Sequence, residues 1–303
     1  MPRRQNRLAS GRRIEYLELG DPAGAPAIYL HGTPSSASEA RWLHAAARAH
    51  GVRLVSPDRP GYLGSDAASD PSFLAVAHDV VELADALSLG RFAVVGFSGG
   101  AGYALATAHA APDQVTVVHL GGGMGSLAGD GWHGGAWLPR RLVFDLAARA
   151  PRVVGPPLAG LLRLLARGIR TRLDTPAEAA IWFFTGSDRG AQVAAIAEYV
   201  RTSPPEDLRG ELADYAAGTA ATRAIVDDLA AYARPWPFAL GDIATPVEIW
   251  HGRDDPAVPV RFAERAAREL GRAQAHVFDG EGHFVFHTHP DAVAASIRRH
   301  AAR

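Results

Sequence analysis

Short apolar runs alternate with longer segments of helical periodicity along most of this chain. Such alternation is typical of a mostly parallel sheet whose strands are joined by helices packed on its faces. The runs that predict buried strands are 27–30, 52–56, 92–95, 115–120, 247–250 and 275–278. The run 14–19, which precedes a Gly-Asp-Pro turn, predicts an early edge strand.

Between these runs, the segments of helical period often begin at Ser, Asp or Pro and end near Gly, as helices do. They predict helices over 36–49, 73–87, 99–110, 260–270 and 291–301. The pattern therefore indicates a doubly wound α/β fold without any appeal to motifs.

The strand signals stop in the middle of the chain. Over residues 124–238 the sequence shows only helical segments punctuated by proline. We therefore predict an α/β core formed by residues 1–123 and 239–303, and an inserted all-helical unit at 124–238. No long low-complexity linker borders the insertion, so we expect it to pack directly on the core.

Composition narrows the class of partner. The chain has 303 residues, 48% of them hydrophobic, and a formal net charge of −1 with a pI near 6.9. That balance offers no electrostatic footprint for nucleic acid or an anionic membrane, so we expect a small-molecule partner. It leaves open whether the chain forms a homodimer. The absence of cysteine excludes disulfides and thiolate catalysis.

The first residues are basic but are not followed by the apolar core of a signal peptide. We therefore expect Arg3 and Arg4 to form a solvated end and the protein to be cytoplasmic. No apolar stretch reaches the roughly 18 residues that a membrane-spanning helix needs.

The pentapeptide Gly96-Phe97-Ser98-Gly99-Gly100 follows one predicted strand and precedes one predicted helix. A strand that turns directly into a helix at a serine strains that serine, and small residues on either side let the two elements approach. This is the pattern of a nucleophile elbow. In a chain with 32 glycines the same pentapeptide could also be a flexible turn, so its context decides.

That context resembles the α/β-hydrolase fold, in the form of a serine hydrolase with a helical cap. Four segments carry the resemblance in the expected order. They are His31-Gly32-Thr33-Pro34; Asp58-Arg59-Pro60-Gly61-Tyr62; the elbow; and the C-terminal pair Gly252-Arg253-Asp254-Asp255 and Gly280-Glu281-Gly282-His283. The resemblance places the insertion over the C-terminal edge of the sheet, where it would roof the pocket.

A serine hydroxyl needs a base, and the base needs a carboxylate to orient it. Ser98 would be the nucleophile and His283 the base. Asp254 and Asp255 are both available after a predicted strand, and the pattern of residues alone does not choose between them. The resemblance selects Asp255 as the catalytic acid and leaves Asp254 to hold the same turn.

The resemblance also implies two oxyanion donors, the backbone N–H groups of Gly99 and Thr33. It gives His31 a bracing role in the loop before Thr33. It makes Asp58 and Arg59 a buried Asp–Arg arrangement in a structural turn, outside the site.

Much of the aromatic surface is concentrated in the insertion, and an apolar roof would favour a hydrophobic acyl or alcohol group. Candidate pocket residues are Trp132, Trp182, Phe183 and Trp236. Asp227 and Asp228 are expected on a solvated helix face. His287 and His289 lack a third ligand at a suitable spacing, so we expect surface or helix-entry histidines and no metal.

These features predict a serine hydrolase of a small, hydrophobic ester, thioester or lactone, working through an acyl-enzyme without a cofactor. Two alternatives stay open. One is a non-hydrolytic enzyme of the same fold, such as a lyase, perhydrolase or cyclase in natural-product metabolism. The other is a small-molecule receptor that has kept the pocket.

Overall fold

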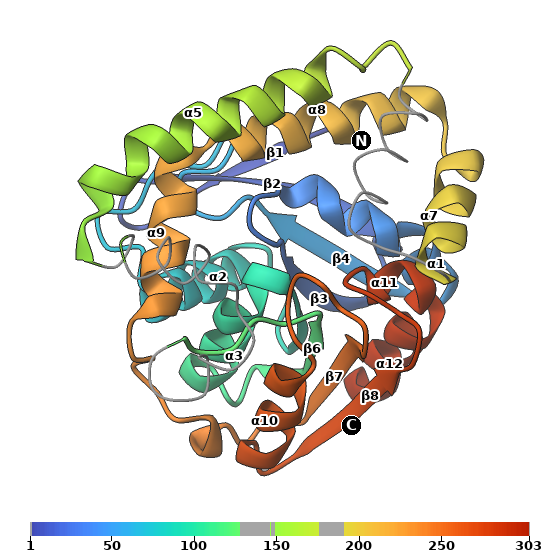
Figure 1. Ribbon diagram of the computed structural model, residues 1–303. Coiled ribbons are helices and arrows are strands. Elements are labelled where there is room, and N and C mark those ends of the chain that lie inside the picture. Colours follow the sequence, from blue (N-terminus) through green and yellow to red (C-terminus); the bar gives the residue numbers. More distant parts are fainter. Residues whose placement is uncertain (1, 128–145, 147–148, 176–190, 303) are drawn as a thin grey trace.

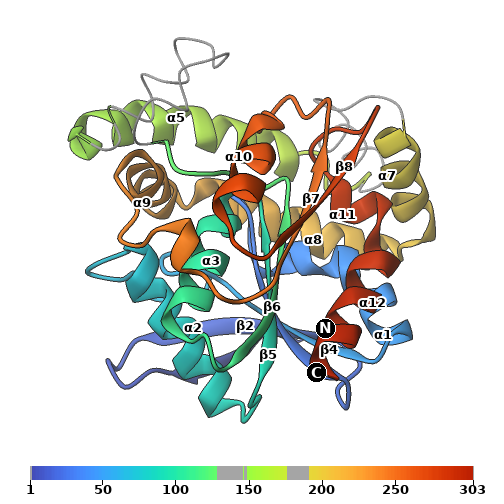
Figure 2. The ribbon, with the colours of Figure 1, turned by 90° about the horizontal axis from the view of Figure 1, so that it is seen from below.

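The computed structural model describes residues 2–127, 146, 149–175 and 191–302. Within them, an 8-stranded sheet has the order β1-β2-β4-β3-β5-β6-β7-β8 and carries helices on both faces (Figures 1 and 2). Pairing is parallel from β4 through β8 and antiparallel at β1 and β2. The strands are β1 Arg4–Arg7, β2 Arg13–Gly20, β3 Ala25–Leu30, β4 Val52–Pro57, β5 Phe92–Phe97, β6 Val115–Gly121, β7 Val247–Gly252 and β8 Ala273–Phe278.

The α/β fold class and the predicted strands are confirmed, but the N-terminal edge differs from the prediction. The run 14–19 is not the edge strand, because β1 pairs with β2 outside it. Arg3 is not solvated either: its guanidinium binds Glu15 at 3.0 Å and Asp214 at 2.9 Å and contacts Asp58. The polar β1 has no apolar signal in the sequence, and it is the open edge of β2 that makes it a strand.

The two faces of the sheet are covered by different helices, because successive strand side chains point to opposite sides. Ile28 and Leu30 of β3 belong to the core packed under α2 and α3, whereas Ala27 and Tyr29 belong to the core under α1 and α12. The core helices are η1 Ala37–Leu43, α1 His44–Ala49, α2 Phe73–Ala86, η2 Ser98–Gly100, α3 Ala101–Ala110, η3 Leu240–Asp242, α10 Arg261–Glu269, α11 Val285–Thr288 and α12 Pro290–Ala301.

Between β6 and η3 the described elements are all helices: α5 Pro151–Arg170, α7 Ala191–Thr202, α8 Pro205–Ala220 and α9 Thr222–Ala233. α8 packs on η1 and α7 on α11 of the core, whereas α5 packs on α8 and α9. A Cβ on Gly218 of α8 would lie 2.1 Å from the Ser35 carbonyl oxygen, so this glycine lets α8 touch the loop after β3. The limits 124 and 238 stay predictions.

None of the helices in the described ranges combines the length and the apolar character that crossing a bilayer requires.

Candidate active site

The predicted elbow joins β5 to α3 through the short helix η2, which starts at Ser98. Ser98 has φ of 50°, a left-handed conformation that residues with a side chain rarely adopt. A Cβ on Gly96 would lie 2.7 Å from Ala104 Cβ, and one on Gly100 would lie 2.0 Å from the Leu30 carbonyl oxygen. Glycine at both positions therefore permits the close approach that holds Ser98 in its strained turn.

His283 and Asp255 meet at the carboxyl ends of β8 and β7. The His283 Nδ1 lies 2.8 Å from Asp255 Oδ2, and the other Asp255 oxygen accepts the backbone N–H groups of Ala257 at 2.7 Å and Val258 at 2.8 Å. Asp254 instead accepts the Gly280 N–H at 3.1 Å. The adjacent aspartates thus have separate tasks, and Asp255 is the one that contacts the imidazole.

The environment of Asp255 keeps it ionised. Burial alone would raise the pKa of this carboxyl, but His283, His251 and the N–H donors bring the pKa below its ordinary value. Burial lowers the pKa of His251, which stays neutral and donates from Nε2 to the Val258 carbonyl at 2.8 Å. A carboxylate held in this way can fix the tautomer of the His283 ring and stabilise its protonated form.

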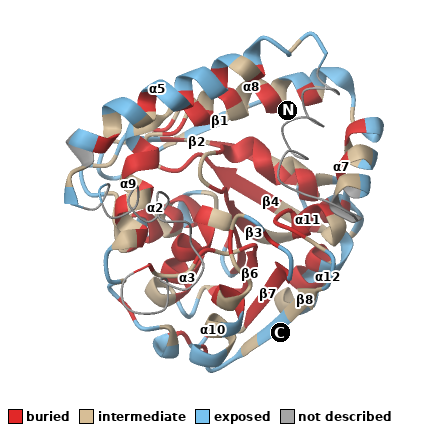
Figure 3. Cartoon of the chain, viewed as in Figure 1, coloured by how far each residue is buried: buried red, intermediate tan, exposed pale blue. Residues whose placement is uncertain are grey.

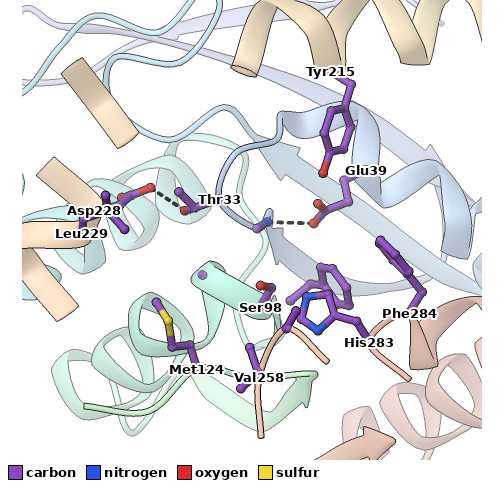
Figure 4. A pocket seen from close by; sticks show the side chains of 14 residues that line it. Thr33, Glu39, Ser98, Met124, Tyr215, Asp228, Leu229, Val258, His283 and Phe284 are labelled. Carbon is purple, nitrogen blue, oxygen red and sulfur yellow. Dashed lines mark hydrogen bonds between the residues drawn. The ribbon is translucent and has the colours of Figure 1, made fainter. Parts of the chain in front are cut away.

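Ser98 and His283 both line one cavity of about 220 Å³ between the sheet edge and helices α8 and α9 (Figure 4). Figure 4 draws the Ser98 side chain and the His283 ring among the residues that line this cavity. Its apolar lining includes Phe97, Met124, Leu229, Val258 and Phe284.

The two predicted oxyanion donors belong to segments that touch. A Cβ on Gly99 would lie 3.1 Å from the Thr33 backbone nitrogen and 2.5 Å from its Oγ1. His31 braces this loop as expected: its Nε2 accepts the Arg59 N–H at 3.1 Å, so Nδ1 carries the proton donated to the Gly32 carbonyl at 2.8 Å. Burial and the charge of Arg59 lower the pKa of His31, which is therefore neutral.

Of two predictions about charged residues, one is confirmed in part and one is wrong. Asp58 and Arg59 are both buried, as predicted, but they do not pair with each other: Asp58 contacts Arg3, whereas Arg59 forms a buried ion pair with Asp228 of α9. Asp228 is only 4% exposed, not solvated. Neighbouring helix positions point about 100° apart, which is why Asp227 pairs at the surface with Arg223 while Asp228 faces the core.

Asp228 is the centre of a network that fixes the Thr33 side chain. Its carboxylate accepts the hydroxyls of Thr33 at 2.6 Å, Tyr62 at 2.6 Å and Tyr103 at 2.7 Å. Arg59 donates to Thr33 Oγ1 at 2.8 Å. Burial alone would lower the pKa of Arg59, and the Asp228 charge raises it above the ordinary value, so the guanidinium stays charged. A cap helix thereby holds the loop that carries a predicted oxyanion donor.

Glu39 of η1 is a pocket residue that sequence reasoning missed. Its carboxyl accepts the Gly32 N–H at 2.8 Å and the Tyr29 hydroxyl at 3.0 Å, and the Tyr215 hydroxyl points toward it in Figure 4. Burial raises the pKa of Glu39 to about 7, against the lowering effect of its hydrogen bonds. An acidic residue shortly after the Thr33 loop was the available signal.

The predicted aromatic pocket residues are not brought together. Trp132, Trp182 and Phe183 lie outside the described residues. Trp236 does not line the Ser98 cavity; its ring centroid lies 5.2 Å from that of Phe73 in the core under α2. The segment that returns from the insertion to the sheet carries this side chain into a core cluster instead of under the cap.

His287 and His289 differ from each other. His287 is not at the surface: it is 8% exposed, its ring centroid lies 4.2 Å from Trp42, and burial lowers its pKa to about 3. His289 stands at the entry of α12, as predicted, with its ring 3.8 Å from that of Phe278 and its Nε2 2.9 Å from Glu281.

Known proteins similar to this chain include a family, curated relatives and solved structures. Residues 27–296 match a family described as the alpha/beta hydrolase family. The chain is 27% identical to 2-hydroxymuconate semialdehyde hydrolase of Pseudomonas putida over 97% of this chain and 92% of that protein. It is 26% identical to a non-heme chloroperoxidase of Streptomyces lividans, with 94% of each covered. Among solved structures, an alpha/beta hydrolase fold protein from Nakamurella multipartita aligns over 100% of both chains with a TM-score of 0.71 and 22% identity.

Proposed function

Since the chain belongs to the alpha/beta hydrolase family, we propose that it is a serine hydrolase that cleaves a small ester, thioester or lactone through an acyl-enzyme. The observation that carries the proposal is the 2.8 Å contact between His283 Nδ1 and Asp255, beside a cavity that Ser98 and His283 share. A nucleophile, a base and an oriented carboxylate are the groups that acyl transfer needs.

In the first half-reaction, the Ser98 hydroxyl attacks the substrate carbonyl while His283 Nε2 takes its proton. The carbonyl π electrons move onto oxygen, and the tetrahedral intermediate then collapses as the bond to the leaving group breaks. His283 gives its proton to the departing alcohol or thiol. Asp255 stabilises the imidazolium throughout and stays ionised, which its lowered pKa supports.

In the second half-reaction, a water molecule loses a proton to His283 and attacks the acyl-enzyme. Breakdown of this second intermediate releases the carboxylic acid and returns the proton to Ser98. The N–H groups of Gly99 and Thr33 would stabilise the oxyanion of both intermediates. Each such donor contributes about 10²- to 10³-fold in kcat.

The cavity supports a small and largely apolar substrate. Its volume of about 220 Å³ lies below the roughly 300–1,000 Å³ of pockets for drug-sized ligands. Phe97, Met124 and Leu229 supply apolar contacts, while Glu39 and Tyr215 supply a polar end. A short acyl chain with a compact leaving group suits this lining.

The test is reaction with a fluorophosphonate, followed by the intact mass. We expect one adduct on the wild type and none on Ser98→Ala. Ser88→Ala is the matched control, because Ser88 also has a positive φ of 53° but lies exposed and away from the cavity. An unmodified wild type, or equal labelling of Ser98→Ala, would refute the proposal.

A second candidate is perhydrolysis, in which hydrogen peroxide replaces water as the acyl acceptor. The similarity to the Streptomyces lividans chloroperoxidase favours it. Incubation with a short ester and hydrogen peroxide separates the two, because a perhydrolase yields peracid and a hydrolase yields only the acid. In both cases Ser98→Ala should abolish the product.

A further inference from the structure

Helix α5 lies on the outside of the cap and uses only part of its circumference to pack (Figures 1 and 3). It packs on α8 and α9. The side chains that it buries recur at helical spacing, so they form one stripe. This stripe consists of Val154, Ala159, Leu162, Ala166 and Ile169.

A second apolar stripe on α5 faces outward. Val153 is 67% exposed, Leu161 65% and Leu164 69%. At 100° per residue these positions fall within one sector beside the buried stripe. In the described part of the chain, the large hydrophobic side chains that are exposed all lie between residues 146 and 165. All of them except Leu146 lie on α5, and large apolar surface gathered on one helix is typical of an interaction site.

The charge along this segment has a single sign. Every charged residue of α5 is an arginine, whereas Asp145 and Asp174 lie beyond its two ends in the sequence. Arg163, Arg167 and Arg170 lie on the helix face next to the exposed leucines, and in the described ranges no carboxylate pairs with them. The net charge of −1 for the whole chain concealed this local excess.

We propose that α5 docks the protein on the surface of an anionic lipid membrane. The exposed leucines would enter the boundary between headgroups and acyl chains, and the arginines would bind lipid phosphates beside them. Charge favours lipid over a second copy of the chain, because pairing α5 with α5 through the leucines would bring the arginines beside them close to those of the second copy. The proposal goes beyond the hydrolase function and does not depend on it.

Co-sedimentation with vesicles tests the proposal. We expect the wild type to pellet with vesicles of phosphatidylcholine and phosphatidylglycerol in a two-to-one ratio, and to stay in solution with phosphatidylcholine alone. Binding should weaken at high salt, because surface charges are then screened. Two variants, Leu161→Ser/Leu164→Ser and Arg163→Gln/Arg167→Gln/Arg170→Gln, should each lose at least about tenfold in partitioning.

The matched control is Arg48→Gln/Arg91→Gln/Arg268→Gln, which removes the same charge from exposed sites outside the cap. It should bind mixed vesicles like the wild type. Unchanged thermal unfolding and ester hydrolysis would show that all variants are folded.

The lack of native cysteine allows a local readout. An environment-sensitive dye on Leu164→Cys should shift to the blue with the mixed vesicles, and the same dye on Arg91→Cys should not. The proposal is overturned if the wild type does not pellet, or if both α5 variants pellet like the control. It is also overturned if vesicles bind nothing while α5 leucines support a concentration-dependent dimer, since the stripe would then be a self-association surface.

Discussion

Two buried aspartates support different parts of the pocket, and their partners differ in kind. Asp255 contacts His283, a side chain that can gain and lose a proton near neutral pH. Asp228 pairs with Arg59, which stays charged, and accepts the Thr33 hydroxyl. The same residue type therefore orients a base for proton transfer at Asp255 and holds a loop in place at Asp228.

The two sites also differ in how far apart along the chain their partners lie. Asp255 and His283 are 28 residues apart, in loops after adjacent strands, whereas Asp228 and Arg59 are 169 residues apart and join the cap to the core. We therefore expect changes at Asp255 to alter chemistry without unfolding the protein. Changes at Asp228 should alter stability first.

The largest expected effect is that of Asp255→Asn on kcat. Asparagine keeps the shape but cannot stabilise the imidazolium or hold the productive tautomer, so kcat for a short nitrophenyl ester should fall about 10³- to 10⁴-fold. Thermal unfolding should change little. Asp254→Asn, which alters only the Gly280 turn, should stay within about twofold in kcat. Equal losses in both variants would contradict the assignment of Asp255.

Asp228→Ala should have the larger effect on stability. It leaves the Arg59 guanidinium charged and buried without its carboxylate, which costs about 3–5 kcal/mol in the free energy of unfolding. Urea denaturation measures this. The control Asp227→Ala removes only a surface pair and should cost under about 1 kcal/mol. Similar midpoints for the two variants would mean that the buried network does not anchor the cap.

Glu39 supports the same loop by accepting the Gly32 N–H. Its contribution to the stability of the fold should depend on pH. Its pKa is about 7 in the folded protein against 4.5 ordinarily, so between these values the folded state holds a proton that the unfolded state has released. The contribution of the Glu39 proton to the free energy of unfolding is thus full below about pH 4.5. It declines as pH rises toward 7, by on the order of 3 kcal/mol in total. Glu39→Gln should remove this decline.

Unfolding free energies measured from pH 5 to 8 test this expectation. Glu211→Gln is the control, because burial raises the pKa of Glu211 to about 7 as well, while Glu211 bonds Trp42 and Tyr199 and does not line the cavity. Both variants should flatten the pH dependence of the free energy of unfolding, but only Glu39→Gln should change kcat. Parallel curves for wild type and Glu39→Gln would refute the assigned proton.

The smallest expected effect is that of Thr33→Val. It keeps the backbone N–H but removes the hydroxyl that joins Asp228 to Arg59, so stability should fall by about 1–3 kcal/mol. We expect about a tenfold loss of kcat, less than for removal of an oxyanion donor. Thr33→Ser keeps the hydroxyl and should retain both properties. A Thr33→Ser variant as impaired as Thr33→Val would show that the methyl group, and not the hydrogen bonds, positions the loop.

The sequence by itself predicted most of the sheet, the elbow at Ser98 and loops that carry His283 and two candidate acids, Asp254 and Asp255. The choice of Asp255 came from the resemblance to the α/β-hydrolase fold, and in the structure Asp255 is the one that contacts His283. The sheet, the elbow and these loops depend on local signals: apolar runs of strand length, glycines at the spacing a strained turn requires, and loops that follow strands and so meet at one sheet edge. A strand as polar as β1 gave no such signal and was found only where β2 offers it an edge.

Only the tertiary structure decided which polar side chains are buried and what they contact. Asp227 and Asp228 are identical neighbours in the sequence, yet one is partly exposed and pairs with Arg223, while the other is buried and binds Arg59. Periodicity shows that a helix has faces but not which face a distant segment covers. The partners of Arg3, Glu39 and Asp228, and the uncovered leucines of α5, depend on how segments far apart in the chain pack together.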